Sequence, residues 1–376
     1  MLKYDQLSYW EKTEYLEHLD VVIIGSGIVG MCTALALIKE KPKLNITLIE
    51  RGYLPTGAST KNAGFACFGS PTELQDDLTR MSKTEVWDTL EMRYRGLQKL
   101  FEIIPKEQMN YEACGSWDLL FSDQKIEEDF LQYLNQEIQR ITKQEGCFRY
   151  DANKISESGF LGFKHAYHNR LEGSLFTHQL IRKLHAKCVS LDIKFLFGTE
   201  VINIEQSASG CRLNTQFGEI RSQKIVVCTN GFAKQLLDLT VEPARAQVLV
   251  TRPIANLKVK GTFHFDSGYY YFRNLGDRLL FGGGRNMDFD SEKTTEMNIT
   301  EPIQTQLISL LKSNILPNQM FEIEYQWAGT MGIGPSKQPI IKKIGEHIVV
   351  GVRMGGMGVA IGALVGEKLS NLVLNE

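Results

Sequence analysis

Three observations in the sequence predict an α/β fold. Near the N-terminus, apolar strand-like segments at 21–24 and 46–49 flank a helix-forming segment that stops at Pro42. Near the C-terminus, residues 346–369 have the pattern of a strand, a glycine-rich turn and a helix. Between them, residues 243–286 contain stretches of alternating polarity that are typical of β-strands. The chain therefore has α/β units at both ends and a strand-rich middle.

The first strand runs directly into GSGIVG at residues 25–30, which has the GxGxxG spacing of a dinucleotide-binding turn. Gly25 permits a tight turn, Gly27 lets the backbone approach a pyrophosphate, and Gly30 lets the helix pack closely on the strand. The helix N-terminus that follows offers unpaired N–H groups and a positive dipole end to the phosphates. Glu50 ends the second strand, where an acid binds ribose hydroxyls and disfavours a 2′-phosphate. These features predict a site for NAD or FAD rather than NADP.

Two further glycine-containing turns favour FAD. Glu50 is followed by a long loop of small residues at 51–71, which suits close approach to a flat ring. The apolar strand 225–228 ends in Thr-Asn-Gly and is expected to turn into a helix. The C-terminal strand and helix enclose a third such turn, so both ends of the chain are expected to meet at one cofactor.

These motifs and others occur in a fixed order along the chain: GxGxxG with Glu50, GASTKNAG, EGSLFTHQL, FGTEVINIE, VVCTNG, YYYFRNLGDRLLFGGG, WAGTMG and GVRMGGMGVAIGALVGEKL. In that order they resemble the D-amino-acid oxidase type of FAD oxidoreductase, which includes glycine oxidase, sarcosine oxidase and D-amino-acid dehydrogenase. The resemblance covers nearly the whole chain. It implies a Rossmann-like FAD-binding domain with an inserted substrate domain built on a large mixed β-sheet.

The implied domains are discontinuous. The FAD-binding domain is expected to comprise residues 1–105, 172–237 and 330–376. The substrate-binding domain is expected to comprise residues 106–171 and 238–329. Helices are expected near 125–145 and 300–314 in the inserted parts, and a short amphipathic helix is expected at 7–18.

The resemblance also implies a reaction. FAD-dependent oxidation of the C–N bond of a small amine or amino acid is expected, by hydride transfer to N5 of the flavin. Relatives that bind FAD covalently use a cysteine in the segment corresponding to 327–331, and none is present here, so non-covalent FAD is expected. Leu280 stands where some relatives carry an oxygen-activating lysine. The electron acceptor is therefore O2 or an unknown oxidant.

Motif matching assigns the cofactor-binding residues. The expected set is Gly25, Gly27, Ile28, Val29, Gly30, Glu50, Arg51, Ser59, Thr60, Asn62, Ala63, Gly64, Val201, Thr229, Gly231, Gly329, Arg353, Gly355, Gly356, Met357 and Gly358. Ala63 and Gly64 are expected near the flavin ring. The helix that starts near Gly358 is expected to direct its positive end at the flavin.

The family implies two catalytic-site residues. Aligning the Arg-Leu-Leu-Phe-Gly end of YYYFRNLGDRLLFGGG places the substrate-site tyrosine at Tyr270, or at Tyr271 if the register slips by one residue. The arginine that pairs with the substrate carboxylate in glycine-oxidase-like relatives is absent, and Met331 occupies about its position. Arg353 matches a second arginine of glycine oxidase, so it is the expected contact for an anionic substrate.

Other functions stay open. An FAD-dependent 2-hydroxy-acid dehydrogenase, a tRNA-modifying flavin oxidase, an NAD dehydrogenase and a non-enzymatic FAD-binding module are the alternatives. The formal net charge of −2 and a pI of about 6.4 give no sign of a nucleic-acid surface. A small-molecule substrate is the expected partner.

Other features of the sequence indicate the cellular location of the protein and whether it binds a metal. The first twenty residues are charged throughout and lack the apolar core of a secretory signal. The seven cysteines are scattered, and no Cys-x-x-Cys pair or Cys/His cluster suggests a metal site. No uncharged apolar stretch is long enough to span a membrane. A cytoplasmic protein with no metal is expected.

Overall fold

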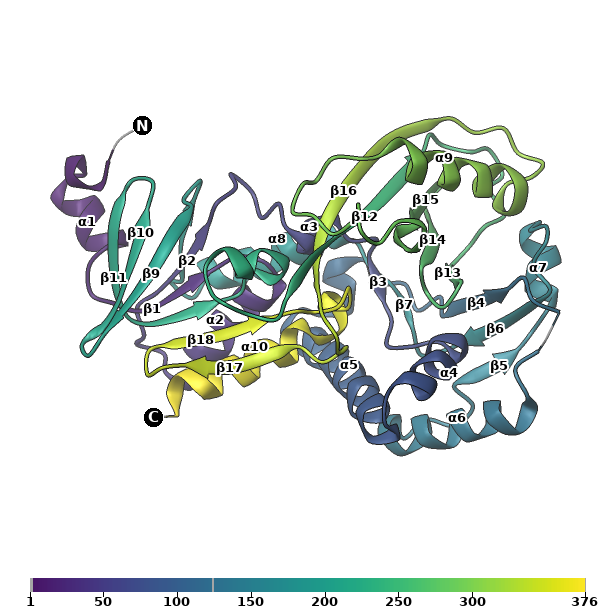
Figure 1. Ribbon diagram of the computed structural model, residues 1–376, viewed down its shortest axis with the longest axis horizontal. Coiled ribbons are helices and arrows are strands. Elements are labelled where there is room, and N and C mark those ends of the chain that lie inside the picture. Colours follow the sequence, from purple (N-terminus) through teal and green to yellow (C-terminus); the bar gives the residue numbers. More distant parts are fainter. Residues whose placement is uncertain (1–2, 124, 376) are drawn as a thin grey trace.

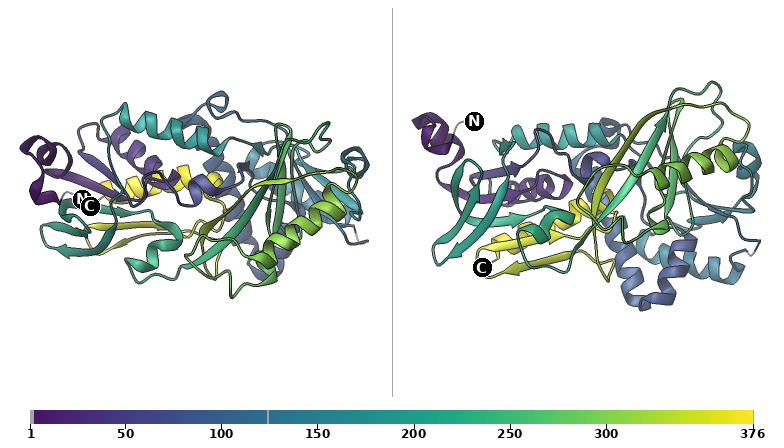
Figure 2. Two further views of the ribbon diagram at one scale, coloured as in Figure 1. Left: turned by 90° about the horizontal axis from the view of Figure 1, so that it is seen from above. Right: turned by 45° about the horizontal axis from the view of Figure 1, so that its top comes forward.

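The computed structural model describes residues 3–123 and 125–375. The chain forms two lobes side by side, each built on a large β-sheet (Figure 1). The N-terminal and C-terminal segments both lie in the first lobe, where they share one sheet. Figure 2 shows from two further sides that the C-terminal helix lies inside this lobe and points toward the second one.

The first sheet has the strand order β17-β18-β11-β1-β2-β8, and a hairpin of β9 and β10 extends from β11. Its strands are β1 (Leu19–Ile24), β2 (Ile46–Glu50), β8 (Lys194–Phe197), β9 (Val201–Ser207), β10 (Gly210–Thr215), β11 (Gly218–Val227), β17 (Ile340–Ile344) and β18 (Ile348–Val352). The central strand β1 is parallel to both β2 and β11, and β18 is parallel to β11. The central strands are continuous apolar runs because helices or the hairpin cover both of their faces.

Four helices pack around this sheet. They are α2 (Ile28–Glu40), α5 (Lys83–Ile103), α8 (Thr177–Val189) and α10 (Gly358–Leu374). Helix α10 lies against both α2 and α5, and glycines make this close packing possible. A Cβ on Gly366 would lie 2.7 Å from the Thr33 nitrogen, and one on Gly96 would lie 2.1 Å from the Ala360 oxygen. The spacing of Gly362 and Gly366 thus serves helix packing inside a protein.

The second sheet has the strand order β16-β12-β15-β14-β13-β4-β6-β5. Its strands are β4 (Ser116–Leu120), β5 (Phe148–Tyr150), β6 (His165–Asn169), β12 (Glu242–Thr251), β13 (Thr262–Phe265), β14 (Tyr270–Leu275), β15 (Arg278–Gly283) and β16 (Ile323–Ile333). One face packs against α9 (Glu301–Leu310) and the π-helical turn Leu311–Ile315 through a phenylalanine-rich core. Alternation along the strands turns the other, more polar side chains toward the first lobe.

Shorter elements complete the two lobes. They are α3 (Ala58–Lys61), β3 (Phe65–Ala66), α4 (Pro71–Arg80), α6 (Glu128–Thr142), α7 (Asn153–Ser158) and β7 (Gly173–Ser174). Strands β3 and β7 form a two-stranded sheet of their own. At the N-terminus, α1 (Tyr9–Tyr15) begins at a capping box made by Ser8 and Glu11.

The helix expected after Thr229 is present as a 3₁₀ helix, Asn230–Gln235. One expected boundary differs from the observed elements. Strand β16 continues to Ile333, so it crosses the expected boundary between residues 329 and 330. The division of the chain into a cofactor domain and a substrate domain stays a prediction.

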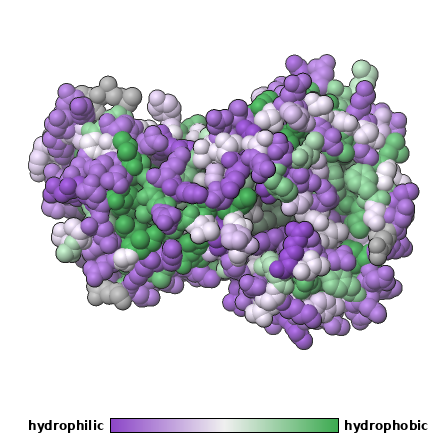
Figure 3. All heavy atoms as spheres, in the orientation of Figure 1, coloured by the Kyte–Doolittle hydropathy of each residue, from purple (hydrophilic) through white to green (hydrophobic). Residues whose placement is uncertain are grey.

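The surface of the molecule is mixed in polarity. Figure 3 shows one face that is mainly polar, with apolar residues gathered over the first lobe and a hollow where the lobes meet. Within the described part of the chain, no helix combines the length and the apolar character needed to cross a bilayer.

Candidate functional site

A cavity of about 1020 Å³ lies where the two lobes meet and is lined by residues of both sheets. Its size is at the upper end of the range for ligand sites and is sufficient for a large cofactor with a substrate beside it. The walls come from segments far apart in the sequence, including the turn after β1, the loop 55–69, β14, β16 and the start of α10.

The turn between β1 and α2 has the shape that a pyrophosphate needs. Gly25 has φ +102°, a conformation that a residue with a side chain rarely adopts. A Cβ on Gly30 would lie 2.0 Å from the Gly25 oxygen, so the helix can meet the strand only with glycine there. The Ile28 N–H donates to Ser59 Oγ at 3.0 Å, so the helix N-terminus already binds an oxygen ligand.

Glu50 lies at the carboxyl end of β2, at the wall of the cavity. Its Oε2 accepts hydrogen bonds from the Ser26 nitrogen at 3.3 Å and from Ser26 Oγ at 3.1 Å. Its Oε1 accepts from the Gly52 nitrogen at 3.0 Å. These bonds hold the carboxylate beside the glycine turn, where ribose hydroxyls would lie.

The loop after β2 is an ordered structure organised by Asn62. The Asn62 side chain donates to the carbonyls of Ala58 and Ser59 and accepts from the Gly64 nitrogen at 2.9 Å. It also accepts from Thr177 Oγ1 at 2.9 Å, which ties the loop to α8. A flat ring would therefore meet a preformed wall here.

Arg273 connects this loop to the second sheet. Its side chain is almost fully buried, and Nη1 donates to the carbonyls of Gly64 and Leu175 at 2.9 Å each. Among the described residues no carboxylate pairs with this guanidinium, and burial lowers its pKa. A buried arginine bonded only to backbone carbonyls fixes the loop at the place where the two lobes meet.

The start of α10 forms the opposite wall. Gly355, Gly356, Met357 and Gly358 all line the cavity. A Cβ on Gly358 would meet only Met354 Cβ, at 3.8 Å, so this glycine borders open space rather than packed protein. Thr229 Oγ1 also lies in the wall, buried and without a hydrogen-bond partner among the described residues. A glycine cradle, a carboxylate at the ribose position and an unpaired hydroxyl are a donor and acceptor set that fits FAD.

The structure brings most of the expected cofactor residues together. The cavity is lined by Gly25, Gly27, Ile28, Val29, Glu50, Arg51, Ser59, Asn62, Ala63, Val201, Thr229, Gly329, Gly355, Gly356, Met357 and Gly358. Four other expected residues lie behind the wall. Gly30 and Gly64 allow close backbone packing, Gly231 packs against the Met331 carbonyl, and the Thr60 hydroxyl donates to the Pro55 carbonyl.

The expected position of Tyr270 is wrong. Its ring stacks on Phe265 at 4.9 Å in the core of the second lobe, away from the cavity. Tyr271, the alternative, lines the cavity together with Tyr269. Burial raises the pKa of Tyr271 to about 12, so its hydroxyl is a neutral hydrogen-bonding group at ordinary pH. The physical reason is the strand register, which pairs Tyr271 with His264 on the cavity face and Tyr270 with Phe265 on the core face.

The structure places the Arg353 side chain outside the cavity, in contrast to the expectation from the sequence. Its backbone is left-handed, with φ +66°, and its side chain does not line the cavity. Nε donates to the Gln338 carbonyl at 3.0 Å and Nη1 donates to the Thr240 carbonyl at 3.1 Å. The guanidinium therefore joins three backbone segments behind the cavity wall, and the expected contact with an anionic substrate is not supported.

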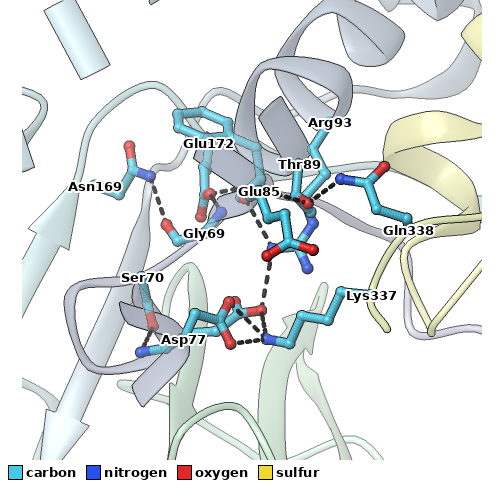
Figure 4. Close-up of polar contacts among 12 residues, drawn as sticks. Gly69, Ser70, Asp77, Glu85, Thr89, Arg93, Asn169, Glu172, Lys337 and Gln338 are labelled. Carbon is cyan, nitrogen blue, oxygen red and sulfur yellow. Dashed lines mark hydrogen bonds and ion pairs between the residues drawn. The ribbon is translucent and has the colours of Figure 1, made fainter. Parts of the chain in front are cut away.

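Motif matching did not identify the charged wall on the α4 side of the cavity. Lys337 Nζ lies 2.8 Å from Glu73 Oε1 and 2.7 Å from Asp77 Oδ1, and Arg93 Nη1 lies 3.0 Å from the same Glu73 oxygen. Figure 4 shows Lys337 extending from its loop toward α4 and Gln338 reaching Thr89 on α5. Arg93 also donates to the Phe68 carbonyl at 3.1 Å. The only signal in the sequence was the i,i+4 spacing of Glu73 and Asp77 on one helix face.

The two carboxyls of this cluster titrate differently. Burial opposes ionisation of Glu73, but Arg93 and Lys337 outweigh it and lower its pKa to about 2. Burial and the neighbouring Glu73 raise the pKa of Asp77, although Lys337 opposes them. The cluster contains two cations and two acids in a partly buried wall, so removing one cation would leave the acids poorly compensated.

Arg285 is a further cation in the wall, beside Tyr269. Its guanidinium lies 4.8 Å from the Phe289 ring centroid, and burial lowers its pKa. It forms no ion pair with any residue that the structure describes. Over residues 3–123 and 125–375, no three His, Cys, Asp or Glu side chains are grouped so that they could hold a metal ion.

Comparisons with known proteins agree with this geometry. A family model described as "FAD dependent oxidoreductase" matches residues 20–372. A protein described as "Probable oxidoreductase OrdL" from Haemophilus influenzae is 20% identical over 381 residues, which cover 96% of this chain and 84% of the relative. Glycine oxidase from Geobacillus kaustophilus is 23% identical over 278 residues, covering 70% of this chain and 69% of the relative.

Solved structures show the same fold. The structure of glycine oxidase from Geobacillus kaustophilus matches with a TM-score of 0.75 at 19% identity, over 94% of each chain. That of L-proline dehydrogenase from P. horikoshii matches with a TM-score of 0.73 at 17% identity, over 96% of this chain and 94% of the other. The match of the family model over almost the whole sequence and the glycine cradle both lead to one conclusion: the chain belongs to the FAD-dependent oxidoreductase family typified by D-amino-acid oxidase and is an FAD-dependent oxidoreductase.

Proposed function

We propose that this protein oxidises the C–N bond of a small amine or amino acid. The observation that carries the proposal is the composition of the cavity between the lobes, which places the glycine turn and Glu50 of the first lobe opposite a polar sheet face of the second. Relatives described as glycine oxidase and L-proline dehydrogenase support an amine-containing substrate. When bound, FAD supplies the hydride acceptor, N5 of the ring.

The residues of this chain would bind and orient the substrate. Tyr271 and Tyr269 come from one face of β14 and its preceding turn, and they can direct phenol hydroxyls at a substrate above the ring. Arg285 lines the cavity on the side of the second sheet and forms no ion pair with a described residue, which favours an anionic substrate group such as a carboxylate on that side. It takes the role that was expected of Arg353.

The start of α10 would stabilise charge on the bound cofactor. The positive end of a 17-residue helix points toward the cavity wall formed by Gly356 and Gly358. Such a helix end favours negative charge, which the reduced ring carries. The electron acceptor is O2 or another oxidant, and the free thiols of the seven cysteines support a cytoplasmic location.

Anaerobic mixing with candidate substrates tests the proposal. The panel contains glycine, N-methylglycine, L-proline, D-alanine and iminodiacetate, with 2-hydroxyglutarate and lactate as hydroxy acids. Loss of the visible absorbance of oxidised flavin with at least one amine, and not with the hydroxy acids, is expected. Bleaching by hydroxy acids alone would instead establish a 2-hydroxy-acid dehydrogenase, and bleaching by no member would favour a non-enzymatic role. Repeating the turnover in air identifies O2 as an acceptor if peroxide forms.

A further inference from the structure

Three neighbouring strands place three ionisable side chains in one row on the cavity face of the second sheet. In the strand register, Asp118 of β4 pairs with His264 of β13, and His264 pairs with Tyr271 of β14. Paired residues of adjacent strands project from the same face of a sheet. His264 and Tyr271 both line the cavity, and Asp118 lies directly behind them.

Asp118 is held firmly by one of its two oxygens. The side chain is 1% exposed, and Oδ2 accepts hydrogen bonds from the Thr72 nitrogen at 2.9 Å and from Thr72 Oγ1 at 2.7 Å. Thr72 lies in the first turn of α4, whose dipole favours a negative charge. The other oxygen, Oδ1, is buried without a hydrogen-bond partner among the described residues and lies 4.0 Å from His264 Nε2. The carboxylate is thus oriented with one free oxygen toward the imidazole.

His264 is the complementary half of this pair. It is 9% exposed, its Nε2 is buried, and no hydrogen bond joins either ring nitrogen to a residue that the structure describes. A buried imidazole that packs for structural reasons normally finds a hydrogen-bond partner. Here one nitrogen faces a carboxylate, and the ring borders the cavity. This is the arrangement of a base whose orientation is set by an acid behind it.

We propose that His264 is a catalytic residue that takes a proton from the substrate's ammonium group, and that Asp118 is the positioning residue that holds the imidazole and stabilises its cation. An N–H bond of the ammonium breaks, its electron pair stays on the substrate nitrogen, and the proton bonds to Nδ1 of His264. No electron is transferred in this step. The proposal rests on the proposed function, because it applies to an amine substrate.

The step answers a chemical requirement. An amine whose pKa is about 10 is only ~0.1% neutral at pH 7, and the ammonium form has no electron pair to assist loss of hydride from the adjacent carbon. A group in the cavity that accepts this proton makes the abundant form of the substrate usable. The buried carboxylate of Asp118, whose Oδ1 has no hydrogen-bond partner among the described residues, would favour the resulting imidazolium.

Three titratable groups surround His264. They are Asp118 from β4, Tyr271 from β14, and Glu172 from the segment before β7, which acts on His264 electrostatically. Glu172 is fully buried, and its oxygens accept from Ser116 Oγ and from the Phe68 and Gly69 nitrogens. Figure 4 shows Glu172 beside Gly69. Because these donors satisfy Glu172, Asp118 is the carboxylate with an oxygen left for the imidazole.

The test measures the rate constant of flavin reduction under anaerobic conditions between pH 6 and pH 10, with glycine, N-methylglycine, L-proline and D-alanine as the probes. The proteins are the wild type, His264→Ala, His264→Gln, Asp118→Asn and the control His165→Gln. His165 is a matched control because it is equally buried on β6 of the same sheet but does not line the cavity.

In the wild type, the rate constant is expected to stay substantial at pH 7. In His264→Ala and His264→Gln the rate constant should fall about 100-fold at pH 7. It should approach the wild-type value as the pH nears the pKa of the free amine. Added imidazole should restore part of the rate of His264→Ala. Asp118→Asn should also lower the rate constant near pH 7, but by a smaller amount. His165→Gln should leave the pH profile unchanged.

Other results would overturn the proposal. A wild-type pH profile in both His264 variants would do so. An equal loss of the rate constant at every pH, without rescue by imidazole, would also do so, since it indicates a structural role. Flavin content and circular dichroism show whether each variant has folded, and His264→Gln covers the case in which His264→Ala does not. If neither these four amines nor iminodiacetate reduces the wild-type flavin, the proposed function fails, and this proposal fails with it.

Discussion

Arg273 is the residue that most directly joins the two lobes at the cavity. It belongs to β14 of the second sheet, yet its guanidinium binds the carbonyls of Gly64 and Leu175 beside the cofactor loop. Lys337 has a similar role on the opposite side, where it links the segment before β17 to α4. Both side chains hold backbone elements in place through charge, so both can be tested by removing the charge and keeping the volume.

Replacing Arg273 with methionine should detach the cofactor loop. The change leaves two carbonyls without their donor inside the protein, and we expect a loss of at least about 2 kcal/mol in the free energy of unfolding. Flavin content after purification should fall at the same time. Urea unfolding and the ratio of flavin to protein absorbance measure both effects. A variant with wild-type stability and a full complement of flavin would show that Arg273 does not fix the loop.

Lys337→Met should produce a loss of stability that depends on pH. In the wild type, the folded pKa of Glu73 is about 2 and lies below its unfolded value of 4.5, so Glu73 contributes stability above pH 4.5 that is lost as the pH falls toward 2. This shift corresponds to about 3 kcal/mol. Without Lys337, the carboxyls of Glu73 and Asp77 repel each other and their folded pKa values rise. Since Arg93 still pairs with Glu73 in this variant, part of the shift should remain, and the variant should lose about 1–3 kcal/mol at pH 8 and less at pH 5, where a proton can bind.

Thermal unfolding at the two pH values checks this expectation. Lys234→Met is the control, because Lys234 forms an exposed ion pair with Glu242 that contributes less than about 1 kcal/mol. An equal loss at pH 5 and pH 8 for Lys337→Met would contradict the assignment of charge in the cluster.

At the scale of elements, local patterns predicted structure well where short segments decide it. The expected unit of strand, helix and strand at 21–49 is observed as β1, α2 and β2, because continuous apolar runs and a glycine turn fix it locally. The side of β14 that faces the cavity could not be predicted in the same way. Its register depends on the turn that leads into β15, and a shift of one residue exchanges Tyr270 and Tyr271 between the two faces.

Arg353 shows a second limit of the sequence. A motif match gives its position in the chain but not its backbone conformation, and the left-handed φ turns its side chain out of the alternation of β18. The charged cluster could not be predicted from the sequence either, because Glu73, Arg93 and Lys337 come from three segments that meet only in the folded protein. The glycine turn at 25–30 and Glu50 were predictable since both belong to one local unit of strand, helix and strand.

The first residue of α10 and its middle should respond differently to an added methyl group. Gly366→Ala places a Cβ 2.7 Å from the α2 backbone, so we expect a loss of about 1–3 kcal/mol in the free energy of unfolding. Gly358→Ala meets no packed atom closer than 3.8 Å and should change that free energy by less than about 1 kcal/mol. It should instead weaken FAD binding, because its methyl group enters the cavity wall. Chemical unfolding and titration of flavin separate the two effects, and equal behaviour of the two variants would refute the division of roles.

At the scale of the whole molecule, the cavity holds its cofactor by shape and polar contacts, and we expect FAD to be bound without a covalent bond. Among the described cysteines, Cys67 and Cys228 line the cavity. Burial raises the pKa of Cys228 to about 12, and burial with Glu172 and Glu73 raises the pKa of Cys67 well above its ordinary value. Neutral thiols are poor nucleophiles. Acid precipitation should leave the flavin in the supernatant, whereas flavin in the pellet would indicate a covalent link.

The pairing of β18 with β11 and the docking of α10 on α2 have a consequence for biosynthesis. The glycine turn at 25–30 leaves the ribosome long before the wall at 355–358 is made. At typical rates of translation, on the order of tens of seconds separate the two. Throughout this interval the N-terminal turn has no partner wall, so the nascent chain cannot enclose FAD. Cofactor capture is therefore expected to follow synthesis of α10, and a message truncated before α10 should yield a protein that is both unstable and colourless.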